Sequence, residues 1–155
     1  MSTPTIWIDG DGAPGACKQI IYKASQRTKT PVILVANRYQ EVPRFSWIQG
    51  VVVSGGLDVA DDYIAEHCQP GDLVITSDIP LAARIIEAGA TVVRFRGEEL
   101  TAVNVQQRLQ VRDFMDELRG SGVTTGGPPP FGPKDKQNFA NALDKWLARV
   151  RAKQG

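Results

Sequence analysis

Six aspartates give the clearest chemical signal in this sequence. Each stands at the end of a short apolar run or in the segment that directly follows one. Carboxylate oxygens are ligands that hard divalent cations prefer, and two such ions can activate water and stabilise a leaving oxygen on phosphate. The pattern therefore predicts a Mg²⁺ or Mn²⁺ site. The six residues are Asp9, Asp11, Asp58, Asp61, Asp62 and Asp78.

Each aspartate taken alone also has an ordinary structural explanation. Asp58 and Asp78 stand where helices are expected to begin, and aspartate is a favourable N-cap residue. The segment Asp9-Gly-Asp11-Gly12 is typical of a tight turn. The group as a whole favours a metal site, because several carboxylates in one place repel one another unless a cation neutralises them.

Other polar residues are expected to reach the same place and to bind substrate. Asn37 ends the second apolar run, and Thr76 and Ser77 end the fourth. Lys18 follows Asp11 by seven residues and is predicted to hold a phosphate, although a surface lysine would fit the pattern equally well. One histidine and two cysteines without metal-ligand spacing argue against a zinc site.

The apolar runs indicate the elements that would position these residues. Short β-rich runs without polar alternation are typical of parallel strands buried on both faces, and helix-like segments lie between them. Parallel strands end at one edge of their sheet, where α/β proteins bind ligands, so the distant aspartates would converge there. Segment 37–50 contains Pro43 and Gly50 and is predicted to be irregular. The predicted strands are 5–9, 31–36, 51–54, 73–76 and 91–95, and the predicted helices are 14–27, 57–68 and 80–88.

Two further helices are predicted after the sheet, over about 102–119 and 134–152. Segment 121–131 between them is rich in glycine and proline, but Val123 and Phe131 lead us to expect that it folds back on the body. The length of 155 residues suits a single domain. The residues predicted to serve packing, and not to form a surface for bases, are Trp7, Trp47 and Trp146.

The composition is that of an ordinary globular protein, with 42% hydrophobic and 23% charged residues. It excludes a disordered or fibrous chain, and no apolar run reaches the roughly 18 residues of a membrane span. The N-terminus lacks the features of a secretory signal, so we expect a cytoplasmic location. The net charge is only +1, but residues 134–155 contain six Lys/Arg and two Asp. This basic tail could contact phosphates, although a solvated helix face would look the same.

Several long and specific motifs resemble the YaiI/YqxD family of uncharacterised bacterial proteins, over nearly the whole chain. One position departs from the family pattern, because the usual cysteine before Pro14 is Ala13 here, and any role of a thiol there would be lost. The motifs are Ile8-Asp-Gly-Asp11 with Pro14 and Lys18, Val35-Ala-Asn37, Gly56-Leu-Asp-Val-Ala-Asp-Asp62, Gly71-Asp-Leu-Val-Ile-Thr-Ser-Asp-Ile-Pro-Leu-Ala-Ala83, Arg112-Asp-Phe-Met-Asp-Glu-Leu-Arg119, Ser121-Gly-Val-Thr-Thr-Gly-Gly-Pro128 and Phe139-Ala-Asn-Ala-Leu-Asp-Lys-Trp146.

That family is grouped with the PIN-like superfamily. The resemblance therefore implies one three-layer α/β domain over residues 1–155, with a parallel sheet of about five strands in the order 3-2-1-4-5. The helices over about 102–155 would form an extension packed on it. The first and fourth strands would be neighbours, which would set Asp9 and Asp11 against Asp78. The resemblance also implies an ancestry among metal-dependent nucleases. It maps their acidic core onto Asp9, Asp58, Asp62 and Asp78, with Asp11 as an additional acid.

The residues and the resemblance together favour a divalent-metal-dependent nuclease or phosphodiesterase, with RNA as the favoured substrate. An inactive PIN-like module that binds nucleic acid or protein is the first alternative. A phosphatase of the haloacid-dehalogenase type is the second, because Asp-x-Asp-Gly after a strand resembles its first motif, with Asp9 as nucleophile. In the nuclease hypothesis the metal ligands are Asp9, Asp11 and Asp78. A second ion or the attacking water would be held by one or more of Asp58, Asp61 and Asp62.

Overall fold

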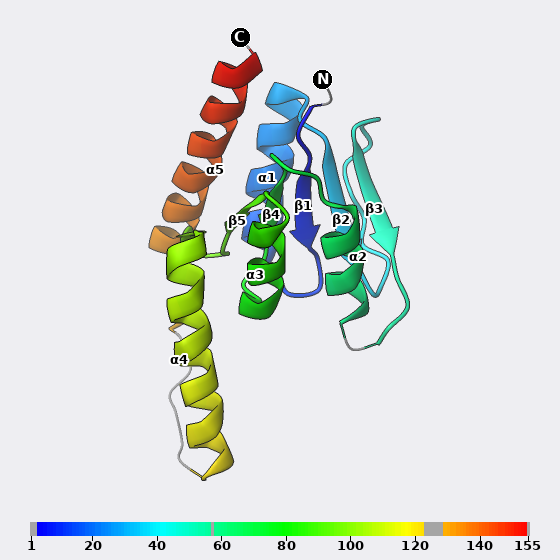
Figure 1. Ribbon diagram of the computed structural model, residues 1–155. Helices are drawn as coiled ribbons and strands as arrows, with labels where there is room; N and C mark the ends of the chain where they lie inside the picture. Colours follow the sequence, from blue (N-terminus) through cyan, green and yellow to red (C-terminus); the bar gives the residue numbers. More distant parts are fainter. Residues whose placement is uncertain (1–2, 57, 123–128, 155) are drawn as a thin grey trace.

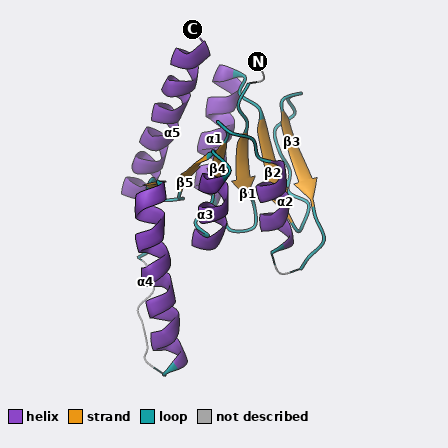
Figure 2. Cartoon of the chain, in the orientation of Figure 1, coloured by secondary structure: helices purple, strands orange, loops and turns teal. Residues whose placement is uncertain are grey.

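The computed structural model describes residues 3–56, 58–122 and 129–154 and shows an α/β protein of three layers (Figure 1 and Figure 2). The middle layer is a sheet of six strands in the order β3-β2-β1-β4-β5-β6. The first five strands of that order pair in parallel, which confirms the predicted order 3-2-1-4-5. The strands are β1 (Ile6–Asp9), β2 (Val32–Ala36), β3 (Ile48–Val52), β4 (Leu73–Ile75), β5 (Thr91–Val93) and β6 (Glu99–Leu100).

Both faces of the sheet are buried, which explains why its strands lack polar alternation. In the central strand β1, Ile6 and Ile8 belong to the hydrophobic core on one face. Trp7, between them, belongs to the core on the other face. The two cores hold β1 in the middle of the molecule, so the residues that follow it are placed by packing on both sides.

Five helices cover the two faces, with ends within two residues of the predicted ones. α1 (Gly15–Thr28) and α5 (Pro133–Gln154) pack together on one face. α2 (Val59–His67) and α3 (Ile79–Glu87) lie on the other. α4 (Ala102–Gly120) packs against α3 and then extends past the body of the molecule (Figure 1). In the described part of the chain, no helix is long and apolar enough to span a membrane.

β3 begins three residues earlier than the predicted strand 51–54, at Ile48. The apolar pattern does not reveal this start, because Gln49 and Gly50 interrupt it. Both positions are exposed, since β3 is at the edge of the sheet, where polar residues and glycine are tolerated. The rest of the irregular segment, residues 37–47, contains no helix or strand, as predicted.

β6 is a strand that the sequence does not predict, and it makes the sheet mixed. It runs antiparallel to β5, with Val92 opposite Leu100. Two residues are too few for a hydrophobic pattern to indicate a strand. The connection from β5 turns at Gly97, which has a φ of +96° and where any Cβ would lie 2.5 Å from the carbonyl carbon of Asn138 in α5. Only glycine fits such a position, so this turn is packed directly on the α5 backbone.

The predicted packing residues are in or against the core. Trp7 and Trp146 are buried, and the Trp47 indole N–H donates to the Ser25 backbone carbonyl and hydroxyl oxygens. Phe131 packs against the core shared by α1 and α5, as expected for a segment that folds back. Val123, the other residue behind that expectation, lies outside the described residues.

Candidate functional site

The carboxyl ends of β1 and β4 lie side by side at one edge of the sheet. Because Ile8 pairs with Ile75, Asp9 and Thr76 are adjacent. The Thr76 hydroxyl donates to Asp9 Oδ2 at 2.9 Å and accepts from the backbone N–H of Asp78 at 3.1 Å. Thr76, which the sequence suggests as a substrate contact, therefore links two predicted metal ligands in this structure.

Asp11 is held by the end of β2. The backbone N–H of Asn37 donates to both carboxylate oxygens of Asp11, at 2.9 and 3.2 Å. The sequence predicts a substrate contact for Asn37, and the structure adds a positioning role for its backbone. The turn after β1 and the segment after β2 are thus joined at the same edge of the sheet.

Asp58 and Asp61 reach this edge from the start of α2. They line a hollow of about 150 Å³ together with Asp9, Asp11 and Asn37. Asp58 occupies the N-cap position of α2 with a φ of 65°, but its side chain makes no capping hydrogen bond. The capping explanation therefore fails for Asp58, and its carboxylate remains a candidate ligand.

Asp62 lies apart from this hollow. Its carboxylate forms an exposed ion pair with Arg84 of α3, at 2.7 Å, and it is not among the residues that line the hollow. Of the two adjacent acids in α2, the structure brings Asp61 to the other carboxylates and directs Asp62 to α3. This placement differs from the mapping of the PIN-like acidic core, which includes Asp62.

Asp78 combines a structural role with a place in the cluster. It is the N-cap residue of α3, where its carboxylate accepts from the backbone N–H of Leu81 at 2.9 Å. The capping explanation thus holds for Asp78. It also lies close to Asp61, since the negative charge of Asp78 is one of the causes that raise the pKa of the Asp61 carboxyl.

Two carboxyls of the cluster are harder to ionise than usual. Burial raises the pKa of Asp9 more than the hydrogen bond from Thr76 lowers it. Burial first, and then the negative charges of Asp78 and Asp9, raise the pKa of Asp61 to about 6. Such perturbed groups are enriched at functional sites.

Lys18 reaches the cluster from α1 with the help of Gln40. The Lys18 ammonium donates to Gln40 Oε1 at 2.6 Å, and the Gln40 amide nitrogen donates to the Gly10 carbonyl at 3.0 Å. Because Gly10 follows Asp9 directly, Gln40 ties the ammonium to the turn that positions the acids. Gln40 lies in the irregular segment 37–47, where no pattern in the sequence distinguishes it.

Ser77 and Cys17 contribute to the fold around the site. The Ser77 hydroxyl oxygen accepts from the backbone N–H of Phe95 at 3.2 Å, which ties it to the segment after β5 and not to the carboxylates. The buried Cys17 thiol donates to the Phe95 carbonyl oxygen, and burial raises its pKa to about 12. A thiol with that pKa is inert at neutral pH, so Cys17 does not replace the family cysteine absent at Ala13.

The donors at this edge have the chemistry of a site for a hard cation. All are oxygens, and the pKa values of two of them are raised by burial and neighbouring negative charges. Within residues 3–56, 58–122 and 129–154, however, no group of three or more His, Cys, Asp or Glu side chains is arranged to hold a metal ion. The described residues therefore form no closed cage of protein ligands for a metal ion.

The comparisons with known proteins identify the family. The model described as "Uncharacterized BCR, YaiI/YqxD family" matches residues 7–149. A UPF0178 protein of Shewanella baltica is 53% identical over 150 residues, covering 97% of this chain and 100% of the relative. Another, from Xanthomonas campestris, is 49% identical over 159 residues, with 99% of each chain covered. No solved structure matches. With a family model and relatives that match along its length, the chain belongs to the YaiI/YqxD family.

Proposed function

We propose that this protein is a divalent-metal-dependent phosphodiesterase that cleaves nucleic acid, with RNA as its main substrate, and that it is a member of the PIN-like superfamily. One observation supports this function most directly. Carboxylates from three separate segments meet at the carboxyl edge of the parallel sheet, where α/β proteins bind ligands. These residues are Asp9, Asp11, Asp58, Asp61 and Asp78.

The cation we propose is Mg²⁺ or Mn²⁺. Mg²⁺ commonly binds through one or two carboxylates and completes its coordination with water and substrate phosphates. Asp9 and Asp78, which lie close enough for the charge of Asp78 to raise the pKa of Asp9, suit this mode of binding. When bound, the cation would neutralise phosphate charge and lower the pKa of a coordinated water.

The side chains around the cluster would transfer a proton, bind phosphate and position the carboxylates. Asp61, with a pKa of about 6, exchanges its proton near neutral pH and is suited to accept one from an attacking water. Lys18, held by Gln40, offers its ammonium to a phosphate oxygen. Thr76 keeps Asp9 in place through its hydroxyl. Asp11, fixed by the Asn37 backbone, closes the side of the hollow next to β2.

A cleavage assay tests this proposal. Labelled single-stranded RNA and DNA are incubated with the full chain in Mg²⁺, in Mn²⁺ and in EDTA. Asp78→Asn should lower the rate by at least about 10- to 100-fold, the loss seen even for residues one step removed from a metal. Asparagine also caps helices well, so α3 should stay intact. Asp62→Asn makes the same change at an acid that pairs with Arg84 of α3 and should retain most of the activity.

Two results would contradict the proposal. Cleavage that continues in EDTA, or that Asp78→Asn leaves unchanged, would exclude a metal site at this edge as its source. Binding of nucleic acid without cleavage in either metal would favour the alternative of a non-catalytic binding module.

A further inference from the structure

Next to the carboxylate cluster lies a second hollow of about 360 Å³, which we call the aromatic pocket. Phe95 and Phe131 contribute their rings, and Pro14, Ser77 and Arg96 complete most of its wall. It adjoins the acids, because a Cβ on Gly12 would lie 3.6 Å from the Phe95 ring and 3.9 Å from Asp9 Oδ2. The Arg96 guanidinium lies over the Phe131 ring, 5.8 Å from its centre.

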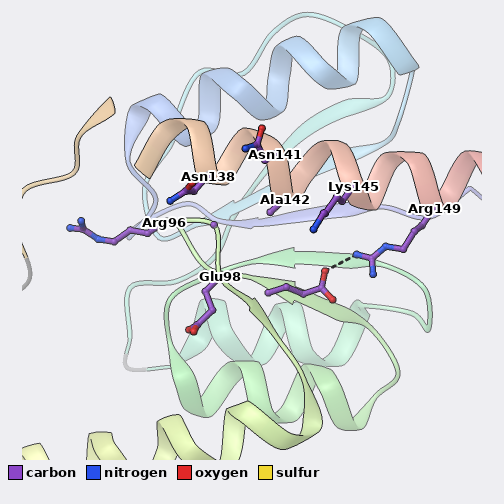
Figure 3. Close-up of a pocket in the computed structure, with 9 residues that line it drawn as sticks. Arg96, Glu98, Asn138, Asn141, Ala142, Lys145 and Arg149 are labelled. Atoms are coloured by element: carbon purple, nitrogen blue, oxygen red, sulfur yellow. Dashed lines mark hydrogen bonds and ion pairs between the residues drawn. The ribbon is translucent and has the colours of Figure 1, made fainter. Parts of the chain in front are cut away.

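Beside the aromatic pocket lies a groove of about 660 Å³ between α5 and the turn from β5 to β6, which we call the α5 groove (Figure 3). Arg96 and Glu98 line both hollows, so the two are neighbours. The acids, the pocket and the groove therefore form one path over the surface. It starts at the carboxyl edge of the sheet and runs along α5.

A polar stripe of α5 forms one wall of the α5 groove. It consists of Asn138, Asn141, Lys145 and Arg149, whose spacing places them on one side of the helix. In Figure 3 the Lys145 and Arg149 side chains extend from α5 toward the strand side of the groove. Among the described residues, Lys145 has no carboxylate within 4.0 Å.

The other charges along the path leave room for an anionic ligand. Arg149 pairs with Glu99 at the surface, and exposed pairs of this kind contribute little to stability. A phosphate can therefore compete with Glu99 for the Arg149 guanidinium. Glu98 is bound by Arg94 and by Arg108 of α4, so its negative charge is already compensated.

We propose that this path binds a single-stranded polynucleotide, with its phosphates along the α5 groove and one base in the aromatic pocket beside the acids. A flat ring stacks on aromatic side chains whatever its sequence, and cations and amides follow the backbone. A duplex keeps its bases stacked inside and cannot offer one to the pocket. The proposal rests on the proposed function only for cleavage, since binding needs no metal.

Fluorescence polarisation with labelled oligouridylate and oligothymidylate, in EDTA, measures the binding. Lys145→Glu should weaken binding about tenfold. It should also make the slope of log K against log[salt] less steep by about 0.7, the value of one phosphate contact on a single strand. Arg151→Glu is the matched control, with the same change of charge. Arg151 lies about 120° around α5 from Lys145 and does not line the groove, so its variant should bind nearly as the wild type does.

A second variant tests the aromatic pocket. Phe131→Leu keeps the apolar contact with the core and removes the ring face, so binding should weaken about fivefold or more while the melting temperature stays close to that of the wild type. An oligonucleotide that contains a photoreactive halogenated uridine should crosslink to Phe131 or Phe95. The comparison of the two oligonucleotides decides between RNA and DNA.

The outcomes separate this proposal from the proposed function. No cleavage by the wild-type protein, together with weaker single-strand binding of Lys145→Glu and Phe131→Leu, would support the binding path and contradict the proposed nuclease function. If cleavage occurs and both variants bind and cleave as the wild type does, the path is wrong and the nuclease stands. Equal effects of Lys145→Glu and Arg151→Glu, or duplex binding as tight as single-strand binding, would also overturn the path.

Discussion

Asp61 is the residue whose ionisation the folded structure most clearly disfavours. Burial and the neighbouring acids raise its pKa from 3.8 to about 6, so the folded protein holds this proton more tightly than the unfolded chain does. The stability that results is fully present at low pH and is lost as the pH rises from about 4 through about 6. Without a cation, ionised Asp61 therefore destabilises the folded protein at neutral pH.

Replacing that charge should stabilise the protein in EDTA. We expect the free energy of unfolding of Asp61→Asn at pH 7 to exceed that of the wild type by less than about 1 kcal/mol, because the carboxyl is partly exposed and solvent screens its charge. The difference should disappear below about pH 4. Thermal unfolding over a pH series measures it, with Asp62→Asn as the control that should give no gain. A wild type as stable as Asp61→Asn at pH 7 would show that the fold does not oppose this charge.

Single residues also show where sequence reasoning reaches its limit. The acids are predicted at the correct edge, because the ends of parallel strands must meet there. The choice between Asp61 and Asp62 is different, since adjacent residues differ by about 100° around a helix and the packing of α2 decides which faces the cluster. Gln40 escapes prediction altogether, because its role depends on the path of an irregular segment.

At the scale of elements, the turn from β5 to β6 is where the sheet packs directly on the backbone of α5. Gly97→Ala should destabilise the protein by about 1–3 kcal/mol, because alanine disfavours a φ of +96° and its Cβ would clash with the α5 backbone at Asn138. Chemical denaturation measures the loss. Gly120→Ala is a useful control, because a Cβ added to that helical glycine would have no neighbouring residue within 4 Å. Its free energy of unfolding should rise by up to about 1 kcal/mol. Equal stability of the two variants would contradict the close packing of this turn on α5.

The elements that the sequence predicts well are those buried on both faces. β1, β2 and β4 are continuous apolar runs, because each lies between other strands and under helices. The two errors are at the ends of the sheet. β3 exposes three of its five residues and β6 has only two, so neither gives the full pattern of a buried strand. Asp9, Asp11 and Asp78 follow the central strands β1 and β4, and the end of β3 before Asp58 differs by only two residues from the predicted one, so these errors do not displace the predicted site.

At the scale of the whole molecule, three layers place the acids at the carboxyl edge of the sheet, with Asp9, Asp61 and Asp78 partly buried there. The helices pack on the faces, while the carboxylates stand at the carboxyl edge. Their mutual repulsion is then a cost that the two cores must offset. A cation that binds only the folded form would remove this cost, and the whole protein would become more stable with it.

Mg²⁺ or Mn²⁺ at about ten times its dissociation constant should therefore raise the melting temperature by roughly 3–6 °C for a domain of this size. The shift should be smaller at pH 5.5 than at pH 7.5, because below a pKa of about 6 the Asp61 proton competes with the cation. Asp78→Asn should lose most of the shift, whereas Asp62→Asn should keep it. Thermal unfolding at matched ionic strength distinguishes binding from screening. An equal shift in all three proteins, or the same shift with added NaCl alone, would mean that the acids hold no specific cation.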